Sequence, residues 1–423
     1  MSMVVENIRV YGDRRDILIK DGTIQQIGTV SPEDKDNAQT VLDGTKRFAI
    51  PSLINAHTHT AMTLFRGFGD DMPLQQWLEE KIWPREAELD HEMVYWGSRL
   101  AILEMIQTGT TFFNDMYWEF DAICEAVRDS GIRAMVSGVF IDQFDPEMAK
   151  KQRNQNKRLF ERTSRLPDRV QFALGPHSIY TVSPESLRWV GEFSQKHNLP
   201  VHIHLCETKE EVENCREQQG MTPVEYLDEL DVLHDNLIAA HAIWLTDHDI
   251  EILAERGVSI IYNPISNLKL TSGDDFAYSK LKNAGIPICL GTDGVASNNS
   301  YNLWEEIKMA SLIQKNRQDD ATALPAHEAF NLATSSAARI FDLNCGRIEE
   351  TARADFLMVR EDHPSLAMSD IHDEFSHLAY TLSPDAIETV ICDGEILMNN
   401  DEIEDKQEIL DKARQYARKL CYD

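Results

Sequence analysis

The chain is short of positive charge and of long apolar runs. It has 423 residues, with 41 lysines and arginines against 71 aspartates and glutamates, and a net charge of -30 at pH 7. Proteins that bind nucleic acid or an anionic membrane surface use lysine and arginine to do so, so we expect neither partner. No apolar run approaches the length of a membrane span. Solubility is the ordinary consequence of such a charge.

The start of the chain and its cysteines predict a reducing compartment. Met1 to Arg15 carries charges throughout and lacks the apolar stretch of a signal peptide. Seven cysteines are present, none of them in a CxxC pair, and a chain of this length needs no disulfides. We therefore expect free thiols and a cytoplasmic location, while homo-oligomerisation stays open.

Two hairpins at opposite ends of the chain predict a small companion domain. Apolar and polar residues alternate on both sides of Asp21-Gly22 and again around Asp393-Gly394, and such pairs suit a two-residue turn with positive φ. We expect residues 1–50 and 350–423 to form one small β-sandwich domain with a C-terminal helix, which the acidic pattern of 404–421 marks as solvated. Two unrelated surface hairpins are the alternative.

The middle of the chain, residues 51–349, alternates short apolar runs with longer amphipathic stretches. Eight runs read as strands, and strand–helix alternation with eight repeats predicts an α/β fold, a (β/α)8 TIM barrel. A doubly wound open sheet is the alternative, weakened because no GxGxxG follows the first strand. The runs are 49–56, 110–115, 134–139, 170–174, 200–204, 237–241, 258–262 and 286–290.

Polar residues stand where these predicted strands end. Reactive side chains of a barrel enzyme lie at the carboxyl ends of its strands. A single histidine there is usually structural, but five histidines and an aspartate at equivalent points of successive units are hard to obtain by chance. The histidines are His57, His59, His177, His204 and His241, and the aspartate is Asp293. Further polar residues at the strand ends are Asp115, Glu207 and Asn263.

The pair His57-Thr58-His59 predicts a metal site. In an extended chain, residues i and i+2 project to one face, so both imidazoles point to one spot in the barrel mouth. Alone, this His-x-His pair is weak evidence for a metal site. Together with Asp293 and a histidine of the fifth strand it becomes strong evidence. Imidazole nitrogen and carboxylate oxygen suit Zn²⁺ or Fe²⁺. His202 and His204 share one face in the same way, so spacing leaves the choice between them open.

Glu207 and Asp293 are candidates for proton transfer. Glu207 follows His204 by three residues, and a carboxylate beside a metal-activated water can shuttle protons. The alternative is a surface glutamate that opens the next helix; Thr208 weakens it, because threonine suits the N-cap and leaves Glu207 in the turn. Asp293 lies in Gly291-Thr-Asp-Gly, where turn chemistry alone would also explain an aspartate.

Several segments together resemble the amidohydrolase superfamily. Within it, the chain resembles the chlorohydrolase and deaminase branch, in particular the 5-methylthioadenosine/S-adenosylhomocysteine deaminases. The likeness runs almost end to end. The segments are Pro51-Ser-Leu-Ile-Asn-Ala-His-Thr-His, His202-Ile-His-Leu-Cys-Glu-Thr, Ala239-Ala-His-Ala, Asn263-Pro-Ile-Ser-Asn-Leu-Lys-Leu, Leu290-Gly-Thr-Asp-Gly-Val-Ala-Ser-Asn-Asn-Ser and Gly346-Arg-Ile-Glu-Glu.

This resemblance implies one divalent metal, usually zinc, on four ligands: His57, His59, His204 and Asp293. It implies that Glu207 shuttles the proton, that Asp293 takes a proton from water, and that His241 holds the water or the developing tetrahedral centre. The reaction would hydrolyse an adenosine-type nucleoside to its inosine analogue and ammonia.

The resemblance also implies substrate contacts at Trp77, Glu86 and His177. A carboxylate at Glu86 suits two vicinal ribose hydroxyls, because it accepts from both. Helix packing for Trp77 and a solvated face for Glu86 are equally good explanations.

One departure bears on the substrate. Relatives that take S-adenosylhomocysteine hold its carboxylate with arginines, whereas the third predicted strand here reads Met135-Val-Ser-Gly-Val-Phe without one. Arg153 and Arg158 lie further on and do not align. Methylthioadenosine or adenosine is therefore favoured. Two other functions stay open: hydrolysis of another heterocycle such as guanine, cytosine, an oxidised purine or a triazine, and a non-catalytic barrel scaffold.

Overall fold

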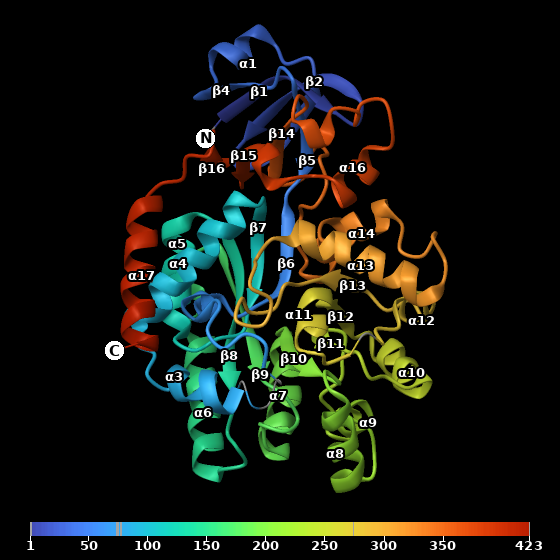
Figure 1. Cartoon of the computed structure of the whole chain (residues 1–423). Helices are drawn as coiled ribbons and strands as arrows, with labels where there is room; N and C mark the ends of the chain where they lie inside the picture. The colour runs from blue at the N-terminus through green and yellow to red at the C-terminus, as the bar shows by residue number, and fades with distance from the viewer. Residues whose placement is uncertain (1, 73–75, 77, 274, 423) are drawn as a thin grey trace.

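The structure, a computed structural model, describes residues 2–72, 76, 78–273 and 275–422. Its strands form two sheets of eight strands each. One sheet is a nearly closed barrel of parallel strands, and the other is a mixed sheet built from both ends of the chain. In Figure 1 the terminal sheet lies at the top and the barrel below it. The predicted barrel with a companion β-domain is confirmed.

The barrel strands run in sequence order from β6 to β13, and each pairs in parallel with the next. Beyond the strands, the Asp293 amide donates to the His57 carbonyl over 2.9 Å and joins the last strand to the first. The strands are β6 (Leu53–Thr58), β7 (Thr110–Asp115), β8 (Arg133–Phe140), β9 (Val170–Pro176), β10 (Val201–Leu205), β11 (Leu237–His241), β12 (Ser259–Tyr262) and β13 (Ile288–Leu290).

The barrel interior is filled by side chains, as it is in other barrels of this kind. Alternate strand positions point inward and pack into one buried cluster that helix α15 closes at one end. Because every second residue of each strand faces this core and the others face the surrounding helices, the strands are apolar on both sides. The cluster includes Ile54, Ala56, Phe112, Met135, Ala173, Ile238, Ala240, Ile261 and Cys289.

The first apolar run, 49–56, is two strands instead of one. Strand β5 (Arg47–Pro51) pairs with β14 of the terminal sheet, and β6 starts at Leu53 and pairs with β7. Ser52 lies between them and donates its amide to the Asp355 carbonyl over 3.3 Å. Each sheet buries its own part of the run. The apolar composition therefore did not indicate that the chain passes from one sheet to the other within it.

The terminal sheet joins the two predicted hairpins. Asp21 and Gly22 have φ of 49° and 75°, and Asp393 and Gly394 have φ of 52° and 73°. The turns touch, since a Cβ on Gly394 would lie 3.2 Å from the Cα of Gly22. In sheet order the strands are β16 (Glu395–Asn399), β15 (Ile387–Cys392), β14 (Phe356–Arg360), β5, β1 (Ser2–Val10), β2 (Asp13–Lys20) and β3 (Thr23–Gly28), with β4 (Thr40–Asp43) paired to β1.

Helices surround the barrel and follow its strands. Most begin at a residue whose side chain accepts a backbone N–H, as Ser183 does for α7 and Thr208 does for α8. They are α3 (Trp83–Glu86), α4 (His91–Gln107), α5 (Phe120–Ser130), α6 (Pro146–Glu161), α7 (Pro184–His197), α8 (Lys209–Gln219), α9 (Pro223–Glu229), α10 (Asp247–Arg256), α11 (Pro264–Lys269), α12 (Tyr278–Asn283), α13 (Leu303–Gln318), α14 (Ala326–Leu332) and α15 (Ser335–Ile340).

Short helices complete the chain outside this ring. They are α1 (Pro32–Asp36), α16 (Glu374–Tyr380) and the one-turn or irregular segments η1 (Thr60–Phe65), η2 (Leu78–Ile82), η3 (Thr163–Arg165), η4 (Pro364–Leu366) and η5 (Pro384–Ala386).

The C-terminal helix α17 (Lys406–Cys421) differs from the solvated helix that we expected. It lies along α4 in Figure 1 and buries Ile409, Ala413, Tyr416 and Leu420. These residues recur three or four positions apart, so they form one apolar stripe beneath an otherwise charged surface. The acidic composition concealed this stripe.

Among the described residues, no helix is long and apolar enough to cross a membrane. All seven cysteines are buried and unpaired.

Candidate active site

The predicted site residues gather at the carboxyl ends of the barrel strands. His57 lies in β6, His204 in β10 and His241 at the end of β11, whereas His59 and Asp293 lie just beyond β6 and β13. Nε2 of His59 lies 3.3 Å from Nε2 of His204 and 3.2 Å from Oδ1 of Asp293. Four strands far apart in sequence thus bring these side chains to one point.

Each histidine of this cluster has its Nδ1 atom held by another group. His59 Nδ1 donates to the Met116 carbonyl over 2.6 Å, and His204 Nδ1 donates to the His177 carbonyl over 2.8 Å. Nδ1 of His57 lies 2.8 Å from Nε2 of His202. A held Nδ1 fixes the ring and directs the Nε2 lone pair toward the centre, as in metal-ligating histidines.

Asp293 is anchored on its other side. Its Oδ2 accepts hydrogen bonds from Ser266 (2.6 Å) and Ser297 (3.1 Å), while Oδ1 faces the histidines. Burial would raise the pKa of Asp293, but the close approach and charge of His57 and His59, whose Nε2 atoms lie 3.3 and 3.2 Å from Oδ1, hold that pKa well below its usual range. The carboxylate is therefore charged at neutral pH and can bind a cation.

The backbone at the site is held in an uncommon conformation. His241 and Asp293 have φ of 72° and 66°, and Cys206, beside Glu207, has φ of 50°. Non-glycine residues with positive φ cost free energy and cluster at functional sites. The surrounding hydrogen bonds hold these turns in place, so the side chains keep one direction.

The donor set fits a divalent metal. Nε2 of His57 is fully buried and, among the described residues, lacks a hydrogen-bond partner. One possible ligand atom from each of His57, His59 and Asp293 lies within 4.8 Å of the other two. The same holds for one possible ligand atom from each of His57, His204 and His241. A buried ring nitrogen without a partner is costly, and a cation among three imidazoles and a carboxylate would satisfy it. Zinc and other first-row metals prefer such ligands.

Glu207 and His241 stand side by side next to this cluster. Oε2 of Glu207 lies 3.8 Å from Nε2 of His241, whose Nδ1 donates to the Asn267 side-chain oxygen over 2.9 Å. The Glu207 amide donates to the Glu211 carboxylate over 2.8 Å, which keeps Glu207 in the turn before α8. Burial raises the pKa of Glu207, so its carboxyl can carry a proton nearer to neutral pH.

A pocket opens above the cluster with a mainly apolar wall. His177 and Glu86, two predicted substrate contacts, line it, and Tyr117 donates to Glu86 over 2.6 Å. Burial raises the pKa of Glu86. Trp77, the third predicted contact, lies outside the described residues. The wall also contains Met62, Trp83, Met116, Trp118, Val139, Ile141, Tyr180 and Leu270.

Several residues that support the site escaped prediction from the sequence. Ser266, Asn267 and Ser297 hold Asp293 or His241 by their side chains. His202, which spacing left as an alternative ligand, instead lies behind His57. Small polar residues such as serine and asparagine do not by themselves indicate a site. The only sequence signal for Ser266 and Asn267 was their position, shortly after the seventh strand.

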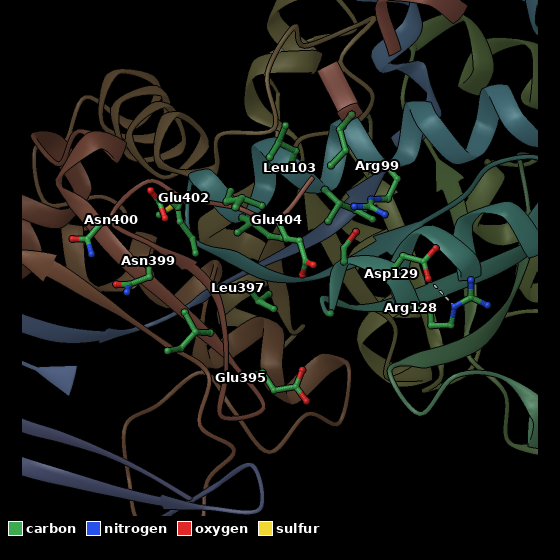
Figure 2. A pocket seen from close by; sticks show the side chains of 18 residues that line it. Arg99, Leu103, Arg128, Asp129, Glu395, Leu397, Asn399, Asn400, Glu402 and Glu404 are labelled. Atoms are coloured by element: carbon green, nitrogen blue, oxygen red, sulfur yellow. Dashed lines mark hydrogen bonds and ion pairs between the residues drawn. The ribbon is translucent and has the colours of Figure 1, made fainter. Parts of the chain in front are cut away.

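Another hollow lies at the seam between α4, α5 and the strand β16. Figure 2 shows Arg99 and Arg128 on its barrel side and Glu395, Glu402 and Glu404 on the side of the C-terminal segment. Its lining contains none of the predicted site residues. The strand ends, rather than this seam, therefore hold the candidate active site.

The amidohydrolase family matches residues 48–397 of the chain. The chain belongs to the amidohydrolase family. This stretch contains the barrel and every candidate site residue.

Relatives of this amidohydrolase match it over nearly its whole length. It is 42% identical to the 5'-deoxyadenosine deaminase of Methanoregula boonei over 432 residues, 98% of this chain and 97% of the relative. It is 41% identical to 5-methylthioadenosine/S-adenosylhomocysteine deaminase 1 of Archaeoglobus fulgidus over 386 residues, 90% of each chain.

A solved deaminase structure has the same fold as this chain. The crystal structure of an adenosine deaminase from Xanthomonas campestris with bound zinc aligns with a TM-score of 0.89 at 31% identity, covering 99% of this chain and 98% of the other. The expected family and branch are confirmed.

Proposed function

We propose that this amidohydrolase deaminates adenosine-type nucleosides, with 5'-deoxyadenosine, 5'-methylthioadenosine and adenosine as its substrates. The observation that carries the proposal is the convergence of three imidazoles and a carboxylate below a pocket that also contains Glu207 and Glu86. The deaminase names of relatives about 40% identical over at least 90% of the chain support it.

His57, His59, His204 and Asp293 would hold one divalent metal, and zinc is the proposed ion. The zinc named with the Xanthomonas campestris deaminase supports that choice. When bound, such a metal lowers the pKa of water from about 16 toward about 7, which supplies a nucleophile at neutral pH.

The seven buried, unpaired cysteines support a reducing, cytoplasmic location.

The proposed chemistry uses three side chains of this chain. Asp293 takes a proton from the attacking water, and Glu207 delivers a proton to the purine ring nitrogen as the C–O bond forms at the carbon that bears the amino group. His241, whose Nδ1 proton is donated to Asn267, accepts a hydrogen bond from the attacking water with its Nε2 and holds that water in place. The proton held by Asp293 then passes to the amino group, the C–N bond breaks, and the amine leaves as ammonia. The hydroxyl proton returns to Glu207 as the ring carbonyl forms, so both side chains end in the protonation states in which they began.

Glu86 and His177 would orient the nucleoside. Glu86 can accept from both ribose hydroxyls, and Nδ1 of His177 is engaged by Thr181 over 2.9 Å, which leaves its Nε2 for the ligand. The aromatic and aliphatic wall suits an adenine ring and a small, uncharged 5' group.

The described part of the pocket wall offers no counter-charge for the carboxylate of an amino-acid tail. Among the described residues that line it, none is lysine or arginine. Arg153 is occupied by Glu185 (2.8 Å) on the outer helices, and Arg158 is exposed on α6. S-adenosylhomocysteine would have to bury its carboxylate in this pocket without a positively charged partner, which is costly. This supports the substrates that lack the carboxylate.

Ammonia release from a panel of nucleosides and free bases tests the function. The panel holds 5'-deoxyadenosine, 5'-methylthioadenosine, adenosine, guanine and cytosine. Turnover confined to the adenosines supports the proposal, and turnover of guanine or cytosine alone refutes it.

A further inference from the structure

A buried glutamate behind the site bonds to two segments of the chain, one that holds His241 and one that carries Asp293. Glu306, on α13, is 0% exposed. Each of its two oxygens accepts one hydrogen bond: Oε2 from the Ile265 amide (3.1 Å) and Oε1 from the Asn298 side chain (2.5 Å). Both donors belong to segments that carry site residues, and neither belongs to α13 itself.

The first bond fixes the segment that holds His241. Ile265 lies in the first turn of α11, whose N-cap residue Asn263 makes no capping hydrogen bond. The first N–H groups of a helix need partners from outside it, and Glu306 supplies one from another helix. α11 in turn carries Ser266, which donates to Asp293, and Asn267, which accepts from His241.

The second bond fixes the segment that carries Asp293 itself. Asn298 shares its Nδ2 group between Glu306 and the Thr292 carbonyl, 2.7 Å away, and Thr292 directly precedes Asp293. Asp293 has a φ of 66°, a conformation that persists only where neighbours hold it. The link from Glu306 through Asn298 is one of the contacts that do so.

We propose that Glu306 is a positioning residue that aligns Asp293 and His241 with each other by bonding to both segments at once. A carboxyl group is suited to this place, because each of its two oxygens can accept a hydrogen bond, and the two oxygens face in different directions. An amide there would turn its NH2 group toward one of the two donors. Only the activity readout of this inference rests on the proposed deaminase function.

The test compares Glu306→Gln with a matched control, Asp249→Asn. Asp249 is also 0% exposed and also accepts hydrogen bonds, from the Thr246 amide (2.7 Å) and the Thr222 hydroxyl (2.5 Å). These bonds belong to the start of α10 and join none of the site residues. Both substitutions remove a buried acceptor, so both lower the melting temperature. We expect only Glu306→Gln to lower kcat, by about 10–100-fold, with KM unchanged. A kcat loss as large in Asp249→Asn would overturn the proposal.

Hydrogen–deuterium exchange of the metal-free proteins gives a second readout that needs no activity. In Glu306→Gln the amides of residues 263–270 and 292–299 should exchange faster than in the wild type, and in Asp249→Asn they should not. Unchanged exchange in both segments contradicts the proposal. A wild type without deaminase activity would refute the proposed function and leave this exchange test standing.

Asn298→Ala separates the two bonds and serves if Glu306→Gln does not fold. It removes the link to Thr292 but keeps the bond to Ile265. Faster exchange is therefore expected in residues 292–299 and not in 263–270. Equal changes in both segments would show that Glu306 does not act through two separate bonds.

Discussion

Nε2 of His202 lies 2.8 Å from Nδ1 of His57. His202 is fully buried. When His57 Nε2 binds a metal, the ring proton of neutral His57 must lie on Nδ1 and is donated to His202. In the proposed metal site, His202 would therefore support the ligand His57 rather than bind the metal itself.

His202→Ala should therefore weaken metal binding without abolishing it. Removal of a group that orients a metal-binding histidine costs about 10–100-fold in affinity. Zinc content measured during titration with a chelator checks this, with exposed His91→Ala as the control. Wild-type zinc retention in His202→Ala would refute the supporting role.

Glu207→Gln should keep the metal and lose activity. The amide fills the same space but cannot carry a proton, and loss of a general acid or base costs about 100–10,000-fold in rate. Steady-state kcat together with metal content checks this. Glu210→Gln, an exposed neighbour on α8, should behave as the wild type; turnover retained in Glu207→Gln would remove Glu207 from its role.

Glu86→Gln should raise KM for nucleosides by about tenfold, because one of two accepting oxygens becomes a donor. The KM for free adenine, which has no ribose, should not change if adenine is turned over at all. Glu88→Gln, two residues on, is the control. An unchanged KM for adenosine in Glu86→Gln would contradict the ribose contact.

S-adenosylhomocysteine should be a poor substrate. Its carboxylate would enter a pocket whose described lining contains no lysine or arginine, and an unpaired buried charge is costly. We expect kcat/KM at least about tenfold below that for 5'-methylthioadenosine. A kcat/KM for S-adenosylhomocysteine equal to or above that for 5'-methylthioadenosine contradicts this expectation.

Stability should depend on pH through Glu306. Burial raises its pKa to about 8, against the lowering effect of its bond from Asn298. Between the unfolded pKa of about 4.3 and 8, the folded state binds a proton that the unfolded state has lost, so stability falls as pH rises through this range. The difference in melting temperature between wild type and Glu306→Gln should therefore shrink from pH 5 to pH 8. A constant difference would contradict the raised pKa.

The barrel and the centre of its site could be predicted because they rest on local pattern. His57 and His59 stand two residues apart in an extended strand, so their shared face follows from strand geometry alone. Asp293 follows from its place just beyond the last strand. These relations need only the order of strands and helices. The fifth strand supplies either His202 or His204, and only the family resemblance chooses His204.

The supporting contacts could not be predicted in this way. The bonds of Glu306 to Asn298 and Ile265 depend on how α13 packs against α11 and β13. From sequence alone, a glutamate on a helix is ordinarily interpreted as a solvated residue. Tyr117 reaches Glu86 across 31 residues of sequence, a pairing without any local signal. The split of the first run at Ser52 was hidden because two different sheets bury its two halves.

Ammonia release from 5'-deoxyadenosine by the zinc-loaded protein, beside the same protein stripped of metal, tests the proposed deaminase function. We expect one ammonia and one 5'-deoxyinosine for each nucleoside consumed, with the activity lost on stripping and restored by zinc. Metal-loaded protein that binds zinc at the cluster but releases no ammonia from any adenosine would contradict it.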